Sequence, residues 1–182
     1  MMFIVRGMPE QRTNPAFPPT LKEVQDDKGK LVWTVMVLLG VAFLAICALE
    51  VLWSIRYAPG YTARYGTVWE YARDWSNWMP GKTCTYYVNA WVTDKINRDT
   101  IVRFFAGNFA LGIPLGLMIP YFLPKMRTLG KTCAAGAAFV MAKEAVQVLL
   151  MLGSFDIDGI LLSCLGMMLG YLLFAKLLRR YA

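Results

Sequence analysis

Residues 155–173 read FDIDGILLSCLGMMLGYLL, and this stretch decides the fold because its apolar part can cross a lipid bilayer as a helix. Small or polar residues recur along it at steps of three and four positions: Asp156, Gly159, Ser163, Gly166 and Gly170. Helical residues at these steps share one face. Gly166 and Gly170 form a GxxxG pattern, which lets a second helix approach closely. The stretch therefore predicts a membrane helix that packs through a small-residue face with an acid at one end.

Three further apolar stretches have the length of a membrane span, so that the four predicted spans are residues 31–55, 104–123, 129–152 and 159–178. Lipid cannot satisfy a free backbone, so each span must be helical. The 182 residues are 57% apolar and 17% charged, against about 25% charged in a typical soluble domain. The predicted fold class is all-α, a polytopic membrane protein built as a four-transmembrane-helix bundle.

The distribution of Lys and Arg predicts how the chain crosses the membrane. The link between the second and third spans carries Lys125, Arg127 and Lys131, whereas residues 153–158 contain two aspartates and no positive charge. The positive-inside rule puts the first link in the cytoplasm and the second outside. We therefore expect a multi-pass protein of the plasma membrane with both termini cytoplasmic.

This topology divides the chain into five parts. They are a cytoplasmic N-terminal segment, the first transmembrane helix, an extracellular aromatic-rich loop, a core of three membrane helices and a cytoplasmic tail: residues 1–30, 31–55, 56–103, 104–178 and 179–182. The N-terminal segment lacks the early apolar core of a cleaved signal peptide, so we expect the first span to act as an uncleaved anchor.

The long outer loop is rich in aromatic residues, with ten Trp and Tyr side chains. Within it, Val68, Ala72, Trp75 and Met79 follow the period of an amphipathic helix. Such a helix lies in the headgroup region with its aromatics as anchors. The alternative is that the aromatic faces stack on a sugar or lipid ligand.

Composition excludes several kinds of chemistry. The chain has no histidine, which rules out a Ser-His-Asp triad and an HExxH zinc site. The four cysteines show no CxxC or metal-ligand spacing, so no disulfide framework is expected. The net charge of +7 is typical of basic residues flanking membrane spans. We expect no nucleic-acid partner, since the aromatics do not lie within basic runs.

Polar residues inside the spans are costly and need a reason. In the third span, Glu144 and Gln147 share a face, while Lys143 points elsewhere. In the second span, Asn108 begins a stripe with Gly112 and Gly116. Pro114 lies within that stripe, and we expect it to kink the helix.

The depth of these groups predicts that they converge near the outer leaflet. The predicted cluster is Asn108, Glu144, Gln147, Asp156, Asp158 and Ser163. One interpretation is a buried network that fixes helix register, with Arg103 or Lys143 compensating an acid. The other is a site open to the outer surface that binds a cation, or a cationic or hydrogen-bonding ligand.

Three segments together resemble the VanZ-like family: GNFALGIPLGLMIPYF (107–122), KEAVQVLL (143–150) and residues 155–173. By resemblance, the characteristic positions are Asn108, Pro114, Gly116, Glu144, Gln147, Asp156, Asp158, Gly166, Gly170 and Tyr171. Three positions differ from the family pattern, since Gly159 replaces a second acid, Ser163 replaces an asparagine, and Gly153 or Ser154 replaces an arginine before the first Asp.

The resemblance implies a role in low-level resistance to teicoplanin-type glycopeptides. The bilayer is one expected partner, and a lipid-linked cell-wall precursor or a lipidated glycopeptide is another. A cation-dependent membrane enzyme is an alternative, in which Glu144, Asp156 and Asp158 hold a divalent cation and no other cofactor is needed. A small transporter or lipid-binding protein is a further alternative.

Overall fold

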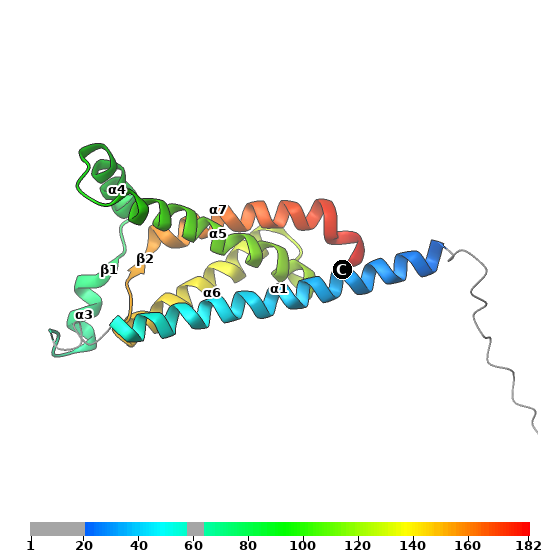
Figure 1. The fold of residues 1–182 in the computed structure, drawn as a ribbon, viewed down its shortest axis with the longest axis horizontal. Helices are drawn as coiled ribbons and strands as arrows, with labels where there is room; N and C mark the ends of the chain where they lie inside the picture. The colour runs from blue at the N-terminus through cyan, green and yellow to red at the C-terminus, as the bar shows by residue number, and fades with distance from the viewer. Residues whose placement is uncertain (1–20, 58–63) are drawn as a thin grey trace, which may run out of the picture.

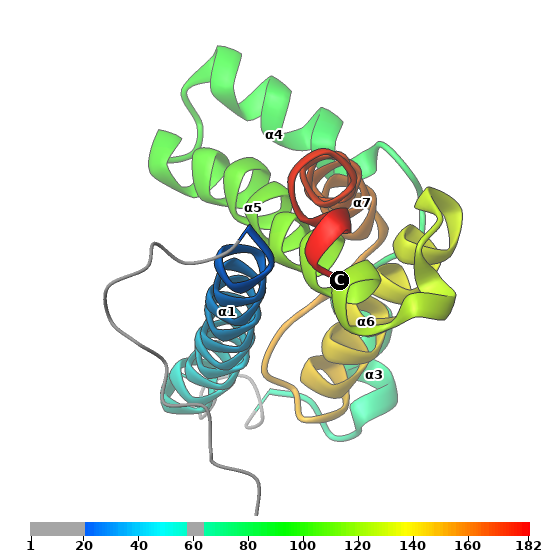
Figure 2. The same cartoon turned by 90° about the vertical axis from the view of Figure 1, so that its right-hand side faces the viewer.

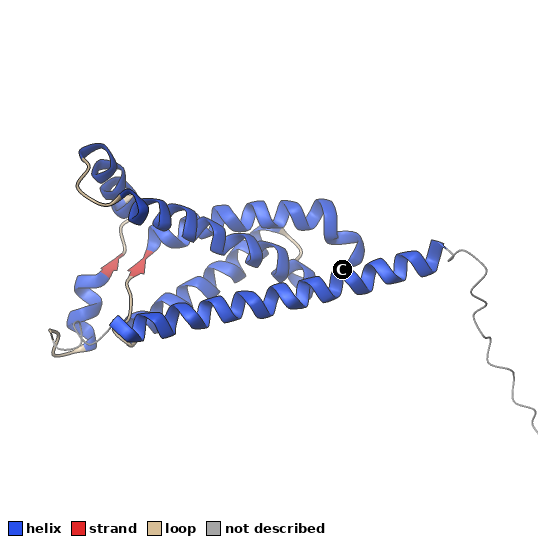
Figure 3. Ribbon diagram, in the orientation of Figure 1, coloured by secondary structure: helices blue, strands red, loops and turns tan. Residues whose placement is uncertain are grey.

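The structure is a computed structural model that describes residues 21–57 and 64–182. Four of its helices are long and apolar enough to cross a membrane, over Val24–Leu52, Arg98–Phe122, Leu129–Leu149 and Ile157–Tyr181. The only strands in the described ranges are two residues long and pair in parallel: β1 (Ser76–Asn77) and β2 (Phe155–Asp156) (Figure 3). The predicted fold class, an all-α protein with four membrane helices, is confirmed.

The long helices form a bundle, and two short helices lie at one end of it. α5 (Arg98–Phe122), α6 (Leu129–Leu149) and α7 (Ile157–Leu173) pack together, and α1 (Leu21–Tyr57) runs beside them (Figures 1 and 2). The two helices of the long loop, α3 (Val68–Trp75) and α4 (Lys82–Thr93), lie at the end where α7 begins (Figure 1). The C-terminus lies at the opposite end, where the short helical segments η2 (Phe174–Leu178) and η3 (Arg179–Tyr181) follow α7.

The third span ends earlier than the predicted residue 152, because the chain turns sharply after α6. The backbone N–H of Leu152 donates to the carbonyl of Gln147 at 2.7 Å, and that of Met151 donates to Val148 at 2.9 Å. Met151 has a positive φ of 53°. This hydrogen-bond pattern is a Schellman motif, which closes a helix through a left-handed residue.

The amphipathic helix of the loop is shorter than its sequence pattern. α3 begins at Val68, and its N-cap residue is Thr67, whose side chain accepts a hydrogen bond from the N–H of Glu70 at 3.2 Å. It ends at Trp75 because Ser76 and Asn77 form β1 against Phe155 and Asp156. Met79 therefore lies beyond the helix that its spacing predicted.

α5 and α7 are in direct backbone contact through their glycines. A Cβ atom at Gly112 would overlap the backbone of Ser163, and one at Gly166 would overlap the carbonyl of Phe109. A Cβ atom at Gly116 would likewise overlap the backbone of Met167, and one at Gly170 would overlap the carbonyl of Ile113. α5 remains helical through Pro114, which lies between its two glycines. These contacts fix the height of α7 against α5, since neither helix can slide without a clash.

Met167, fully buried, is the centre of the packing with the third helix. Its side chain lies against Gly136 of α6, and Val140 on the same helix is also fully buried. Most apolar side chains of α1, in contrast, are exposed, including Leu38, Leu44 and Leu52. α1 thus presents an apolar surface suited to lipid.

We predict that Gly112→Ala destabilises the bundle because the new methyl group has no space between α5 and α7. Overpacking of this kind costs about 1–3 kcal/mol, and thermal unfolding in detergent should show a lower Tm. Gly107→Ala on the same helix is the matched control, since nothing lies within 4 Å of its Cβ position. Equal Tm values for the two variants would contradict the close approach of α5 and α7.

Candidate functional site

Three acids from the predicted cluster form a connected series of hydrogen bonds at the end of the bundle. Oε2 of Glu144, on α6, accepts the backbone N–H of Asp156 at 3.0 Å. Asp156 is the N-cap residue of α7, and its Oδ1 accepts the N–H of Asp158 at 3.0 Å. Such a bond satisfies a backbone donor that a helix start leaves free. Glu144 and Asp156 therefore both stabilise the start of α7.

Asp158 does the same for a different helix. Its side chain is 2% exposed, and its two oxygens accept the backbone N–H groups of Gly81 and Cys84. Gly81 is the N-cap of α4 and has no side chain to cap the helix itself. The carboxylate of Asp158 thus caps α4 from 77 positions away in the sequence. Negative charge at a helix N-terminus is favourable because the helix dipole is positive there.

Asn77 joins the long loop to the same series. Its amide nitrogen lies 3.1 Å from Oδ1 of Asp156 and 2.9 Å from the hydroxyl of Thr83, and it donates to both. Its amide oxygen accepts the N–H of Met79 at 3.1 Å. Tyr71, which is buried, donates its hydroxyl to the carbonyl of Gly153 at 2.8 Å. The loop is therefore bound to the turn between α6 and α7 by side chains as well as by the β1–β2 pair.

The other residues of the predicted cluster lie deeper or to one side. The hydroxyl of Ser163 is fully buried, 3.0 Å from the carbonyl oxygen of Asn108 and 2.9 Å from that of Gly159. Asn108 donates its amide to Phe104 at 2.8 Å and lies against Gly159. Gln147 packs on Gly153. The structure thus places Asn108 and Ser163 at the α5–α7 contact.

Of the two basic residues that the sequence suggested as partners of an acid, Lys143 forms an ion pair, although its partner is outside the three-acid series. Lys143 pairs with Glu50 on α1, at 3.4 Å between Nζ and Oε2. Among residues 21–57 and 64–182, no group of three or more acidic or cysteine side chains could hold a metal ion. Glu144, Asp156 and Asp158 each accept a backbone N–H instead.

A polar cleft of about 490 Å³ opens beside the series of acids. It is lined by α3, β1, α4 and the α6–α7 turn, with side chains of Asp74, Trp75, Ser76, Asn77, Lys82, Thr83, Tyr86, Tyr87, Ser154, Phe155 and Asp156. Of the predicted polar cluster, only Asp156 lines it. Apart from Ser154 on the α6–α7 turn, the other polar residues of the cleft come from the loop that the sequence marked only by its aromatics.

The acids create a negative field at the start of α4. Burial raises the pKa of the Cys84 thiol, and the charges of Asp158 and Asp156 raise it further. Burial also raises the pKa of Tyr87, with smaller contributions from Tyr86 and Asp156. Negative charge beside an acidic group favours its neutral form. Burial is the main cause of both shifts, and the charge of Asp156 contributes to each.

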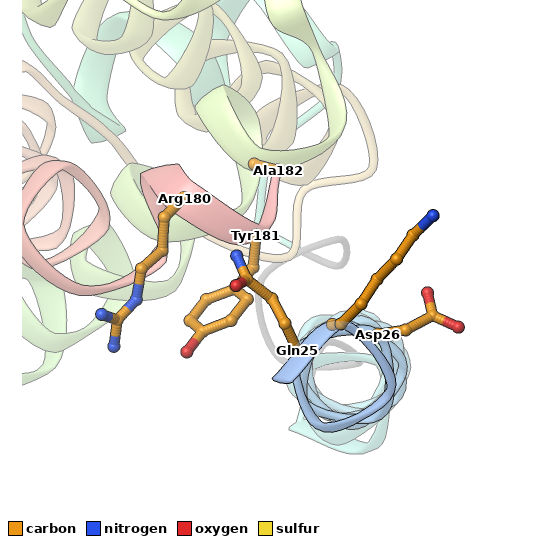
Figure 4. A pocket seen from close by; sticks show the side chains of 7 residues that line it. Gln25, Asp26, Arg180, Tyr181 and Ala182 are labelled. Atoms are coloured by element: carbon orange, nitrogen blue, oxygen red, sulfur yellow. The ribbon is translucent and has the colours of Figure 1, made fainter. Parts of the chain in front are cut away.

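A second hollow, of about 810 Å³, lies at the opposite end of the molecule (Figure 4). It separates the first turns of α1 from the C-terminal turn and is lined by Lys22, Gln25, Asp26, Gly29, Arg180, Tyr181 and Ala182. The guanidinium of Arg180 lies over the ring of Tyr181, 4.8 Å from its centroid. This hollow is separate from the series of acids and from the polar cleft.

Four membrane helices and a polar end closed by a loop define a polytopic membrane protein with a small helical cap. The VanZ/LLP1 family model matches residues 34–179, and the chain belongs to this family. This match confirms the resemblance carried by the three sequence segments. Neither a search of curated proteins nor a search of solved structures found a match.

We predict that Asp158→Asn speeds alkylation of Cys84 near neutral pH. Asp158 helps to raise the pKa of Cys84, so loss of its charge increases the reactive thiolate at a given pH. The measurement is the labelling rate against pH in a variant with the other three cysteines changed to Ala.

The control for this experiment is Asp94→Asn, at the far end of α4. It should leave the pH profile of Cys84 labelling unchanged. If Asp158→Asn also leaves that profile unchanged, the contact between Asp158 and the start of α4 is refuted.

Proposed function

We propose that this VanZ-like membrane protein protects the cell envelope against lipid-tailed glycopeptides of the teicoplanin type, through the polar cleft at the α3–α4 end of the bundle. The observation that carries the proposal is the series of hydrogen-bonded acids, which holds the loop helices over the membrane core and leaves a polar cleft beside them. We place this end at the outer leaflet of the plasma membrane, where such glycopeptides act.

The charge of the cleft supports a cationic or hydrogen-bonding ligand. Asp74 and Asp156 line it against a single cation, Lys82. Asp156 is held in place by the backbone N–H of Asp158 and by the amide of Asn77, both of which bind its Oδ1. An opposite charge is attracted more strongly in such a partly buried position than in bulk water.

The positions of the loop aromatics support the same proposal. Trp75, Tyr86 and Tyr87 line the cleft, whereas Trp78 stacks on Phe155 with a centroid distance of 4.3 Å. Aromatic rings supply faces for a sugar or for a cation. The aromatic-ligand interpretation of the loop is therefore part of the proposal, beside the role of α3 at the membrane surface.

We predict that expression in a susceptible Gram-positive host raises the inhibitory concentration of teicoplanin several-fold. Asp158→Asn should reduce this protection, because it removes the charge that holds the start of α4. Asp27→Asn, an exposed acid on α1, is the matched control and should protect like the wild type. Unchanged teicoplanin sensitivity, with the protein verified in the membrane, would end the proposal.

The orientation of the chain gives a separate prediction. Ser154→Cys, in a variant with the four native cysteines replaced, should react with a membrane-impermeant thiol reagent added to intact cells. Lys125→Cys, on the link between the second and third spans, should react only after the membrane is permeabilised. The reverse pattern would put the acids in the cytoplasm and exclude an outer-leaflet site.

A further inference from the structure

An apolar groove lies next to the polar cleft. It has a volume of about 360 Å³ and separates α4 from the first turns of α5, with Tyr87, Val88, Trp91, Val92, Ile101, Val102, Phe105 and Ala106 along its walls. Ile101 at its floor is 3% exposed, whereas Val92 at its rim is 78% exposed. Such a groove removes apolar surface of a ligand from water and gives it no polar partner.

Tyr87 is a wall of both the polar cleft and the apolar groove. Its ring packs against Phe104 at a centroid distance of 4.8 Å, which fixes it at the junction of α4 and α5. The two hollows therefore meet at one side chain. A ligand that fills both must have a polar and an apolar part joined directly to each other.

The negative charge of the cleft indicates which polar group its ligand carries. Oδ1 of Asp156 accepts two hydrogen bonds, from Asn77 and Asp158, while Oδ2 accepts none within the described residues. No buried side-chain oxygen of the described residues lacks a hydrogen bond, so Oδ2 must be accessible. Asp74 is exposed on the same cleft. Two accessible carboxylates beside three aromatic rings favour an ammonium group.

We infer that the cleft and the groove form one two-part site for a single-chain cationic amphiphile, with its ammonium group between Asp74 and Asp156 and its alkyl chain along the α4–α5 groove. The occupant is a ligand that arrives at the membrane surface, rather than a two-chain phospholipid of the bilayer. The inference rests on the proposed function in one respect, namely that the ligand reaches the site from the outer surface of the membrane. Both hollows fall within the size range of small-ligand sites, about 300–1,000 Å³.

The test uses the full chain in phosphatidylcholine nanodiscs, with empty nanodiscs as the blank. Three probes share one tail and differ in head group: octylammonium, octanol and octyl sulfate. Calorimetric titration should give the lowest Kd for octylammonium and the highest for octyl sulfate. Equal affinity for octylammonium and octyl sulfate would overturn the inference.

Two variants separate the two parts of the site. Asp74→Asn should weaken octylammonium binding about two- to fivefold, as expected for one exposed charge, and leave octanol binding unchanged. Ala106→Trp fills the groove and should weaken all three probes. Asp27→Asn and Ala45→Trp, an acid and an exposed alanine on α1, are the matched controls. If Ala106→Trp binds every probe as the wild type does, the placement of the alkyl chain in the α4–α5 groove is overturned.

Two further measurements identify the kind of ligand and separate a failure of the site from a failure of the proposed function. Nanodiscs enriched in phosphatidylethanolamine should leave octylammonium binding unchanged, and progressive competition by this lipid would overturn the choice of a single-chain ligand. Teicoplanin protection by the wild type without selective octylammonium binding would leave the proposed function standing and refute the two-part site. Selective octylammonium binding without any protection would support the site and refute the proposed function.

Discussion

The hydrogen bonds of Asp158 to the start of α4 are the interaction on which the site depends. A helix start leaves backbone N–H groups without partners, and Gly81 offers no side chain for them. Asp158 is buried with 2% of its surface exposed, so removing its partners would leave a charge in a poorly solvated place. The helix and the carboxylate therefore satisfy each other. Because α4 forms one wall of the cleft and one wall of the groove, this single contact positions both.

The contact of α5 with α7 sets the height at which Asp158 meets α4. The glycines of the two helices bring backbone against backbone, and a methyl group at Gly112 or Gly166 would clash. Close packing without side chains leaves no freedom to slide, which is how small residues specify register in membrane helices. Ser163 adds a hydroxyl close to the carbonyl oxygen of Asn108 at the top of this contact. The acids at the start of α7 are thereby fixed relative to the first turns of α5, which form the far side of the groove.

The sequence predicted the membrane core well because its signals are local and periodic. The four spans follow from hydropathy, and the small-residue stripes of Gly112, Gly116, Gly166 and Gly170 follow from helical spacing. The loop was predicted less well, since its structure depends on distant partners. Asn77 and Asp156 pair as strands although 79 positions separate them, and this pairing ends α3 before Met79. Nothing in the local pattern marks Asn77, Lys82 or Thr83 as lining residues, because the cleft exists only when the loop lies on the α6–α7 turn.

The absence of histidine gives this arrangement its chemical character. A histidine partner would titrate near neutral pH, whereas the carboxylates of this series pair with backbone N–H groups. Glu144, Asp156 and Asp158 bind N–H groups, and the lysine nearest to them in sequence, Lys143, pairs with Glu50 on α1 instead. The start of α4 therefore faces the carboxylates of Asp158 and Asp156, with Asp158 bound directly to its backbone. An acidic cleft beside an apolar groove suits recognition of a cationic amphiphile, because the carboxylates attract its head group and the groove removes its alkyl chain from water.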